Sequence, residues 1–216
     1  MTQGTKAVIF DLDGTLVRRT TVSLYLSDWL GHRALIERLE QEYADGQIDN
    51  RQFAAQDAAF YEGRLRTEVW QQLSGIAVVN GIHATVKWLH EHQIAALLAT
   101  MTSSLAAEYF MDRYAFDDAF GCEMDEDSNG RLGGTIRKYV EPKDKVRFLR
   151  GYCQANDIDP SQCVAVGDAR ADVPLFAEVG LAIALNGTEE ANRAADCVLA
   201  TEDLTDIVPL IARRDS

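Results

Sequence analysis

The sequence predicts an α/β fold: a three-layer arrangement in which a parallel β-sheet is covered by helices on both faces. Two observations carry this prediction. Short apolar segments alternate with amphipathic helical segments along most of the chain, as in parallel sheets built from strand–helix–strand units. Within the short segments, polar and apolar residues hardly alternate, as expected for strands that are buried on both faces.

Five segments have the length and composition of buried strands, and six have the pattern of helices. The predicted strands are 7–10, 94–99, 163–166, 181–185 and 197–199. The predicted helices are 82–92, 105–114, 143–156, 173–178, 189–195 and 203–212. Gly180 and Gly187 lie where neighbouring elements should end.

The stretch between the first and second strands, about 20–79, has the pattern of helices alone. Its apolar residues are spaced for helical faces, among them Leu24, Leu26, Leu30, Leu35, Ile36, Leu39, Phe53, Phe60 and Tyr61. This stretch is too long for a simple crossover. We therefore expect a catalytic core made of residues 1–18 and 80–216, with a small helical cap, 19–79, inserted after the first strand.

Composition limits the classes of function. The chain has 216 residues, of which 47% are hydrophobic, and its net charge is −13. The negative charge argues against nucleic acid or an anionic membrane as partner. No segment approaches ~18 uninterrupted apolar residues, and the N-terminus lacks the layout of a secretory signal. We expect a cytoplasmic protein with reduced cysteines, whose oligomeric state the sequence does not predict.

Two carboxylates follow the first strand in the run Asp11-Leu12-Asp13-Gly14-Thr15. Ligands collect at the carboxyl ends of parallel strands, where this loop should lie. Gly14 permits a turn that directs both carboxylates into one crevice. Their mutual repulsion would favour a bound cation. A solvated turn at the end of a strand is the alternative interpretation.

A second acidic pair, Asp168 and Asp172, follows the strand at 163–166. Carboxylates at the ends of two neighbouring strands suit Mg²⁺, which prefers oxygen ligands and keeps water and phosphate in its shell. The alternative for Asp172 is a helix N-cap. Both roles are compatible if Asp172 caps the helix and supports the metal site indirectly.

Two further segments could bind an anion. Hydroxyl groups and free backbone N–H groups follow the strand at 94–99, in the run Thr100-Met101-Thr102-Ser103-Ser104. Lys145, near the start of a helix, could supply positive charge. Each signal is weak alone, because Ser and Thr commonly cap helices and most helix lysines are solvated.

Together, the four segments resemble the motifs of the haloacid dehalogenase (HAD) superfamily: DLDGT at 11–15, Thr100, Lys145, and GDARAD at 167–172. The resemblance is to the phosphoserine-phosphatase-like branch (subfamily IB), which has a Rossmann-like core and a helical cap after the first motif. In that branch, the spacing between the motif lysine and the metal aspartate matches Lys145 rather than Lys143.

The resemblance implies a Mg²⁺-dependent phosphatase that acts on a small phosphorylated metabolite. Asp11 would attack phosphorus and form an aspartyl-phosphate, and Asp13 would act as general acid and base. Asp11, the backbone carbonyl of Asp13, and Asp168 would hold Mg²⁺, with Asp172 orienting the metal shell. Thr100, Met101 and Lys145 would bind the phosphate.

The chain departs from phosphoserine phosphatases where those enzymes recognise serine. Thr20 stands at the position of the glutamate that binds the substrate ammonium, preceded by Arg18 and Arg19. An ungapped match places Ala55 where a cap arginine binds the carboxylate, and Met101-Thr102 replaces a glycine pair. We therefore do not expect strict specificity for phosphoserine. Arg18 or Arg19 could contact a more anionic substrate or lie at the surface.

Other signals were weaker. The start of a calcium-binding EF-hand loop is imitated by Asp125, Asp127, Asn129 and Gly130. However, Ile136 stands where that loop needs glutamate. A β-hairpin turn beside the active site is therefore the better interpretation. The histidines, His32 included, show no ligand spacing, and we interpret them as surface or helix residues.

Two alternative functions remain. A phosphotransferase or phosphomutase would share every motif. A non-catalytic binding protein on the same fold is disfavoured because Asp11, Asp13 and Asp168 are all present.

Overall fold

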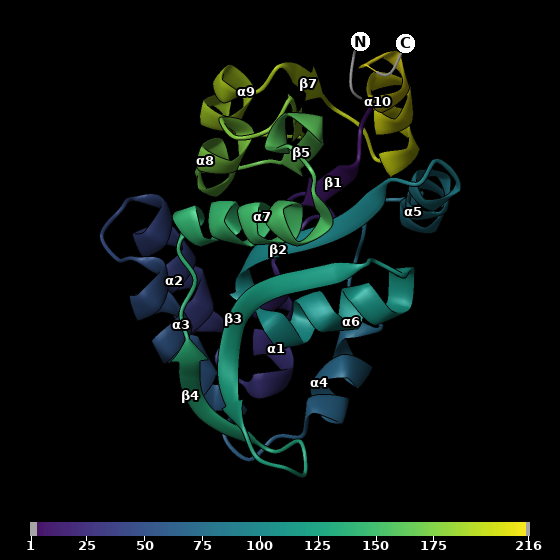
Figure 1. Cartoon of the computed structure of the whole chain (residues 1–216). Coiled ribbons are helices and arrows are strands. Elements are labelled where there is room, and N and C mark those ends of the chain that lie inside the picture. Colours follow the sequence, from purple (N-terminus) through teal and green to yellow (C-terminus); the bar gives the residue numbers. More distant parts are fainter. Residues whose placement is uncertain (1–3, 215–216) are drawn as a thin grey trace.

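A seven-stranded sheet forms the centre of the computed structural model, which describes residues 4–214 (Figure 1). The strand order is β4-β3-β2-β1-β5-β6-β7, and only the β3–β4 pair is antiparallel. The strands are β1 (Ala7–Phe10), β2 (Ala95–Ser103), β3 (Asp118–Glu126), β4 (Leu132–Lys138), β5 (Cys163–Gly167), β6 (Leu181–Leu185) and β7 (Cys197–Leu199). The predicted α/β class is confirmed.

Helices cover both faces of this sheet, and the side chains of β1 show why. Val8 and Phe10 point into one buried cluster, while Ala7 and Ile9 point into another on the opposite face. The first cluster includes residues of α5 (Ile82–Glu91), α6 (Ser104–Tyr114) and α10 (Val208–Arg214). The second includes residues of α7 (Pro142–Asn156), α8 (Val173–Phe176) and α9 (Glu189–Ala194). Short 3₁₀ turns, η1 (Ala59–Tyr61), η2 (Pro160–Gln162), η3 (Arg170–Asp172) and η4 (Leu204–Ile207), complete the helical structure.

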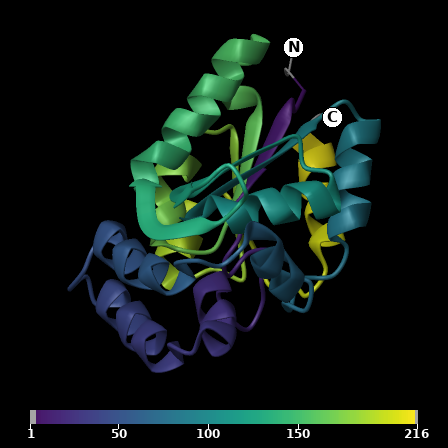
Figure 2. The same cartoon turned by 90° about the horizontal axis from the view of Figure 1, so that it is seen from below.

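The predicted all-helical stretch after β1 forms α1 (Val22–Leu30), α2 (Arg33–Ala44), α3 (Asn50–Ala58) and α4 (Arg66–Leu73). Side chains begin two of these helices: Thr21 caps α1, and Asp49 forms a reciprocal capping box with Gln52 at α3. The four helices group beside the β3–β4 hairpin, away from α8 and α9 (Figures 1 and 2). The boundaries of a cap at 19–79 remain a prediction.

Two features of the sheet differ from the sequence prediction. Strand β2 continues to Ser103 instead of ending at residue 99. Strands β3 and β4 were predicted only as a hairpin turn, because acidic residues and glycines interrupt their apolar pattern. The turn itself is as predicted: the Asp127 carboxylate accepts hydrogen bonds from the backbone N–H groups of Asn129 and Arg131.

Within residues 4–214, no helix combines the length and the apolar character needed to cross a membrane.

Strand register brings the two acidic motifs together. In β1, Phe10 pairs with Leu98 of β2 on one side and with Val166 of β5 on the other. The loops that follow β1 and β5 therefore leave the sheet side by side. The backbone N–H of Asp11 donates to the Val166 carbonyl at 2.9 Å, which fixes the start of the first loop against β5.

Candidate active site

The loop after β1 holds Asp11 in a buried position, with 7% of its surface exposed. Gly14 in this loop has φ +82°, a conformation that favours glycine. A Cβ atom at this position would lie 2.1 Å from Oδ2 of Asp168. Glycine is thus required here both for the turn and for the close approach of the Asp168 carboxylate.

Lys145 lies between two aspartates at the centre of the site. Its side chain is fully buried, and its Nζ donates to Oδ1 of Asp11 and to Oδ1 of Asp172, both at 2.7 Å. The first turn of α7 directs Lys145 toward the sheet. Lys143, two residues earlier, is exposed and forms an ion pair with Glu141. The structure therefore places Lys145, and not Lys143, next to Asp11.

Asp172 and Asp168 occupy different environments. Oδ1 of Asp172 accepts from Lys145, and its Oδ2 accepts from the backbone N–H groups of Asp168 and Ala169, at 3.0 and 3.2 Å. Both oxygens of Asp172 thus have donors, and they fix the course of the loop after β5. Within residues 4–214, the Asp168 carboxylate accepts one side-chain hydrogen bond, from Oγ1 of Thr15 at 3.0 Å.

The acidic groups outnumber the positive charges of the site. Carboxylate oxygens of Asp11, Asp168 and Asp172 lie within 4.8 Å of one another, with Lys145 as the neighbouring cation. Burial, followed by the charges of Asp11 and Asp172, raises the pKa of Asp168 to about 8. Burial and the Asp172 charge raise the pKa of Asp11 to about 6. An oxygen-rich site with excess negative charge fits a divalent cation such as Mg²⁺.

Replacement of Asp168 by Asn should weaken metal binding and stabilise the metal-free protein. A carboxyl whose pKa rises from its usual 3.8 to about 8 on folding makes the folded state less stable as pH increases across that range. At pH 8 we expect Asp168→Asn to raise the free energy of unfolding without metal by about 1–3 kcal/mol. Urea unfolding with EDTA and with Mg²⁺, at pH 5 and pH 8, measures both effects. A variant that Mg²⁺ stabilises as much as the wild type would contradict this assignment.

Asp13, Thr100 and Met101 border a cavity of about 620 Å³. Oδ1 of Asp13 accepts from the backbone N–H of Val22 at 2.7 Å, and burial raises the pKa of Asp13 to about 7. Thr100, at 1% exposure, lies close to the end of β1, and its Oγ1 accepts from the backbone N–H of Thr102. Asp11 and Asp168 also line the cavity, so all predicted site residues except Lys145 and Asp172 border it.

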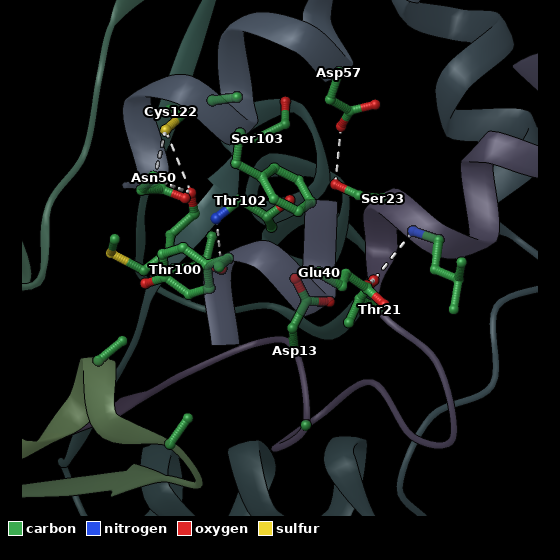
Figure 3. A pocket seen from close by; sticks show the side chains of 18 of the residues that line it. Asp13, Thr21, Ser23, Glu40, Asn50, Asp57, Thr100, Thr102, Ser103 and Cys122 are labelled. Atoms are coloured by element: carbon green, nitrogen blue, oxygen red, sulfur yellow. Dashed lines mark hydrogen bonds between the residues drawn. The ribbon is translucent and has the colours of Figure 1, made fainter. Parts of the chain in front are cut away.

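The other wall of the cavity comes from α1, α2 and α3, and sequence reasoning missed most of it (Figure 3). Helix α3 presents residues at positions i, i+3, i+4 and i+7. The residues of this wall include Ser23, Glu40, Tyr43, Asn50, Phe53, Ala54 and Asp57. The sequence contains the helical spacing of the α3 residues, but this spacing does not reveal which side of α3 faces a cavity.

One histidine was assigned wrongly. His32 is buried, at 5% exposure, and its Nε2 lies 2.8 Å from Oδ1 of Asp57. Its ring stacks on Phe60 at a centroid distance of 4.0 Å. The prediction of a surface or helix residue failed for His32, which is buried at the N-cap of α2, because its partner Asp57 lies 25 residues away in the sequence.

The arginines near the first motif have different positions. Arg18 donates to the Gly14 carbonyl and lies 3.7 Å from Glu202, so it supports the loop and does not line the cavity. Arg19 and Thr20 do line it. On α3, Ala55 is exposed and Ala54 faces the cavity, so neither position supplies an arginine.

Comparisons with known proteins agree with this architecture. The sequence model of the haloacid dehalogenase-like hydrolase family matches residues 8–177. The phosphoserine phosphatase of Saccharomyces cerevisiae is 23% identical over 99% of this chain, and that of Archaeoglobus fulgidus 26% over 95%. The chain spans 69% and 60% of these relatives' own lengths.

A solved structure described as a phospho-aspartyl intermediate analogue of phosphoserine phosphatase superposes with a TM-score of 0.82. Its identity is 21%, and the match covers 96% of this chain and 99% of the other. That likeness supports the same fold. The family match covers most of the chain and includes Asp11, Thr100, Lys145 and Asp168. The chain therefore belongs to the haloacid dehalogenase-like hydrolase family and resembles its phosphoserine-phosphatase-like branch, as the motifs predicted.

Proposed function

We propose that the protein is a Mg²⁺-dependent phosphomonoesterase that hydrolyses a small phosphorylated metabolite through a phosphorylated Asp11. The observation that supports this most strongly is the buried bridge of Lys145 between Asp11 and Asp172, beside Asp168 and Thr100. A buried carboxylate that is held by a lysine and borders a cavity suits nucleophilic attack on an anionic phosphate.

In this proposal, a carboxylate oxygen of Asp11 forms a bond to phosphorus as the bond to the leaving oxygen breaks. Lys145 keeps Asp11 ionised and in place. Asp13 protonates the leaving oxygen and later takes a proton from the water that cleaves the aspartyl-phosphate. The raised pKa of Asp13, about 7, suits both proton transfers near neutral pH. Family members that store the phosphoenzyme carry threonine at this position, so Asp13 favours turnover.

The phosphate oxygens would meet Lys145, the Thr100 hydroxyl and backbone N–H groups near Met101. Mg²⁺, when bound, supplies positive charge beside the transferring group. Asp11, the backbone carbonyl of Asp13, and Asp168 would hold it, while Asp172 keeps the loop after β5 in place through its bonds to Asp168 and Ala169.

Strict specificity for phosphoserine is not part of this proposal, although the relatives named above are phosphoserine phosphatases. Thr20 and Ala54 lack the charges that would recognise the ammonium and carboxylate of serine. We also propose that the protein is cytoplasmic and that its function requires neither a nucleic-acid nor a membrane partner.

The experiment is a screen of the purified protein against phosphorylated metabolites and p-nitrophenyl phosphate, with Mg²⁺ or with EDTA. We expect release of inorganic phosphate only with Mg²⁺ and from a narrow set of esters. Product analysis with added alcohols separates hydrolysis from phosphoryl transfer. Mg²⁺ binding measured by calorimetry, together with no phosphate release or transfer from any compound, would contradict the proposal.

A further inference from the structure

The cavity wall that α1, α2 and α3 supply offers hydrogen-bond acceptors to a substrate. Oγ of Ser23 donates to Oδ2 of Asp57 at 2.9 Å, and Oγ1 of Thr21 donates to Oε1 of Glu40 at 2.5 Å. Each hydroxyl has one proton, so both protons are already used. Only the lone pairs of these oxygens remain for a leaving group.

Asn50 has the same character. Its amide nitrogen donates to the carbonyls of Met101 and Val140, at 3.0 and 2.8 Å, which leaves its side-chain oxygen as an acceptor. Figure 3 shows Ser23, Glu40, Asn50 and Asp57 around the same cavity as Asp13 and Thr100. A leaving group that binds Ser23, Thr21 or Asn50 must therefore bring hydrogen-bond donors.

Glu40 adds a negative charge without a cationic partner. It is half-buried on α2, and among residues 4–214 no lysine, arginine or histidine forms an ion pair with it. Asp57 differs, because His32 lies against its other oxygen. A carboxylate that faces a cavity and accepts a hydrogen bond from the Thr21 hydroxyl is available for a cation from the substrate.

Aromatic and aliphatic side chains complete this part of the cavity. The rings of Tyr43 and Phe53 lie edge to face, with centroids 6.4 Å apart, and both line the cavity with Leu24 and Ile136. Aromatic rings beside a carboxylate are the surroundings that favour an organic ammonium group, through cation–π attraction and charge. Arg19, which follows the loop after β1, is an exposed cation that also lines the cavity.

We propose that Glu40, with the rings of Tyr43 and Phe53, selects phosphate esters whose leaving group is an amino alcohol carrying a positively charged nitrogen and no carboxylate. This inference rests on the proposed phosphatase function and adds the class of substrate. Glu40 is here a specificity-determining residue at a position different from Thr20, where the related phosphoserine phosphatases carry their glutamate.

The test compares pairs of esters of similar shape in which one member carries a positively charged nitrogen and the other does not. Phosphocholine is compared with 3,3-dimethylbutyl phosphate, its neutral carbon analogue, and phosphoethanolamine with 2-hydroxyethyl phosphate. We expect kcat/KM to be at least about tenfold higher for the charged member of each pair, a difference of about 1.4 kcal/mol. Phosphoserine should react more slowly than phosphoethanolamine.

Variants assign the selectivity to residues. Glu40→Gln should reduce both charged-to-neutral ratios to near unity, whatever its effect on absolute rates. Tyr43→Leu should reduce the ratio for the choline pair more than that for the ethanolamine pair. Glu37→Gln is the matched control, because Glu37 lies on the same helix, is exposed and pairs with Arg33; its ratios should equal those of the wild type.

Three results would overturn the inference: equal rates for charged and neutral esters, ratios retained in Glu40→Gln, or a preference for phosphoserine over phosphoethanolamine. Each of these results would be measured on an enzyme that hydrolyses phosphate esters with Mg²⁺, so each leaves the proposed function intact. Failure of the proposed function is distinguishable, since it would also abolish hydrolysis of p-nitrophenyl phosphate.

Discussion

Asp11→Asn should lower phosphatase turnover by at least about 10³-fold while the protein remains folded. The carboxamide has nearly the shape of the carboxylate but is a poor nucleophile, so no phosphoenzyme forms. Lys145 keeps its second partner, Asp172, at 2.7 Å, which limits the cost to the fold. Phosphate release measures the first effect, and circular dichroism with urea unfolding measures the second.

The matched control is Asp112→Asn, because Asp112 is exposed on α6 and does not line the cavity. It should retain wild-type turnover. Turnover of Asp11→Asn within about tenfold of the wild type would exclude Asp11 as nucleophile.

Lys145→Met should abolish turnover and also destabilise the protein. The substitution removes a fully buried cation and leaves Asp11 and Asp172 without their shared partner. Breaking a buried ion pair by removing one member costs about 3–5 kcal/mol, and we expect a loss of about 3 kcal/mol at pH 8. Urea unfolding in the presence of EDTA measures it.

The loss in Lys145→Met should shrink as pH falls. In the wild type, the charge of Lys145 lowers the pKa of Asp11. Removal of the lysine should therefore raise this pKa further above 3.8. A carboxyl with a raised folded-state pKa destabilises the folded protein at high pH, and protonation relieves this at low pH. Lys143→Met, at an exposed position, should change stability by less than about 0.5 kcal/mol at either pH. A Lys145→Met protein as stable as Lys143→Met at pH 8 would contradict the buried bridge.

The sequence predicted the parts of the molecule whose signals are local. Strands β1, β6 and β7 have the predicted bounds, because uninterrupted apolar segments with flanking glycines or polar loops identify buried strands. The acidic motifs were located because each directly follows such a strand. The positions of their carboxylates then follow from strand order.

The features that sequence reasoning missed depend on contacts between distant residues. The hairpin strand β3 has an irregular apolar pattern and is held by its pairing with β2 and β4. Glu40 and Asp57 read as ordinary helix-surface acids until the packing of α1, α2 and α3 turns them toward the cavity. Lys145 was identified only through the pattern of the four motifs. Its own position on a helix did not predict burial, because helix lysines are usually exposed.

The most direct test of the phosphoenzyme is to trap it. The protein is mixed with substrate and Mg²⁺, quenched in acid and reduced with borohydride, which converts an acyl phosphate to the alcohol and so changes the mass of the modified aspartate. Peptide mass spectrometry should find this change at Asp11 alone, and only when both substrate and Mg²⁺ were present. An active enzyme with no modified aspartate, or with the modification at Asp13 or Asp168, would contradict the account.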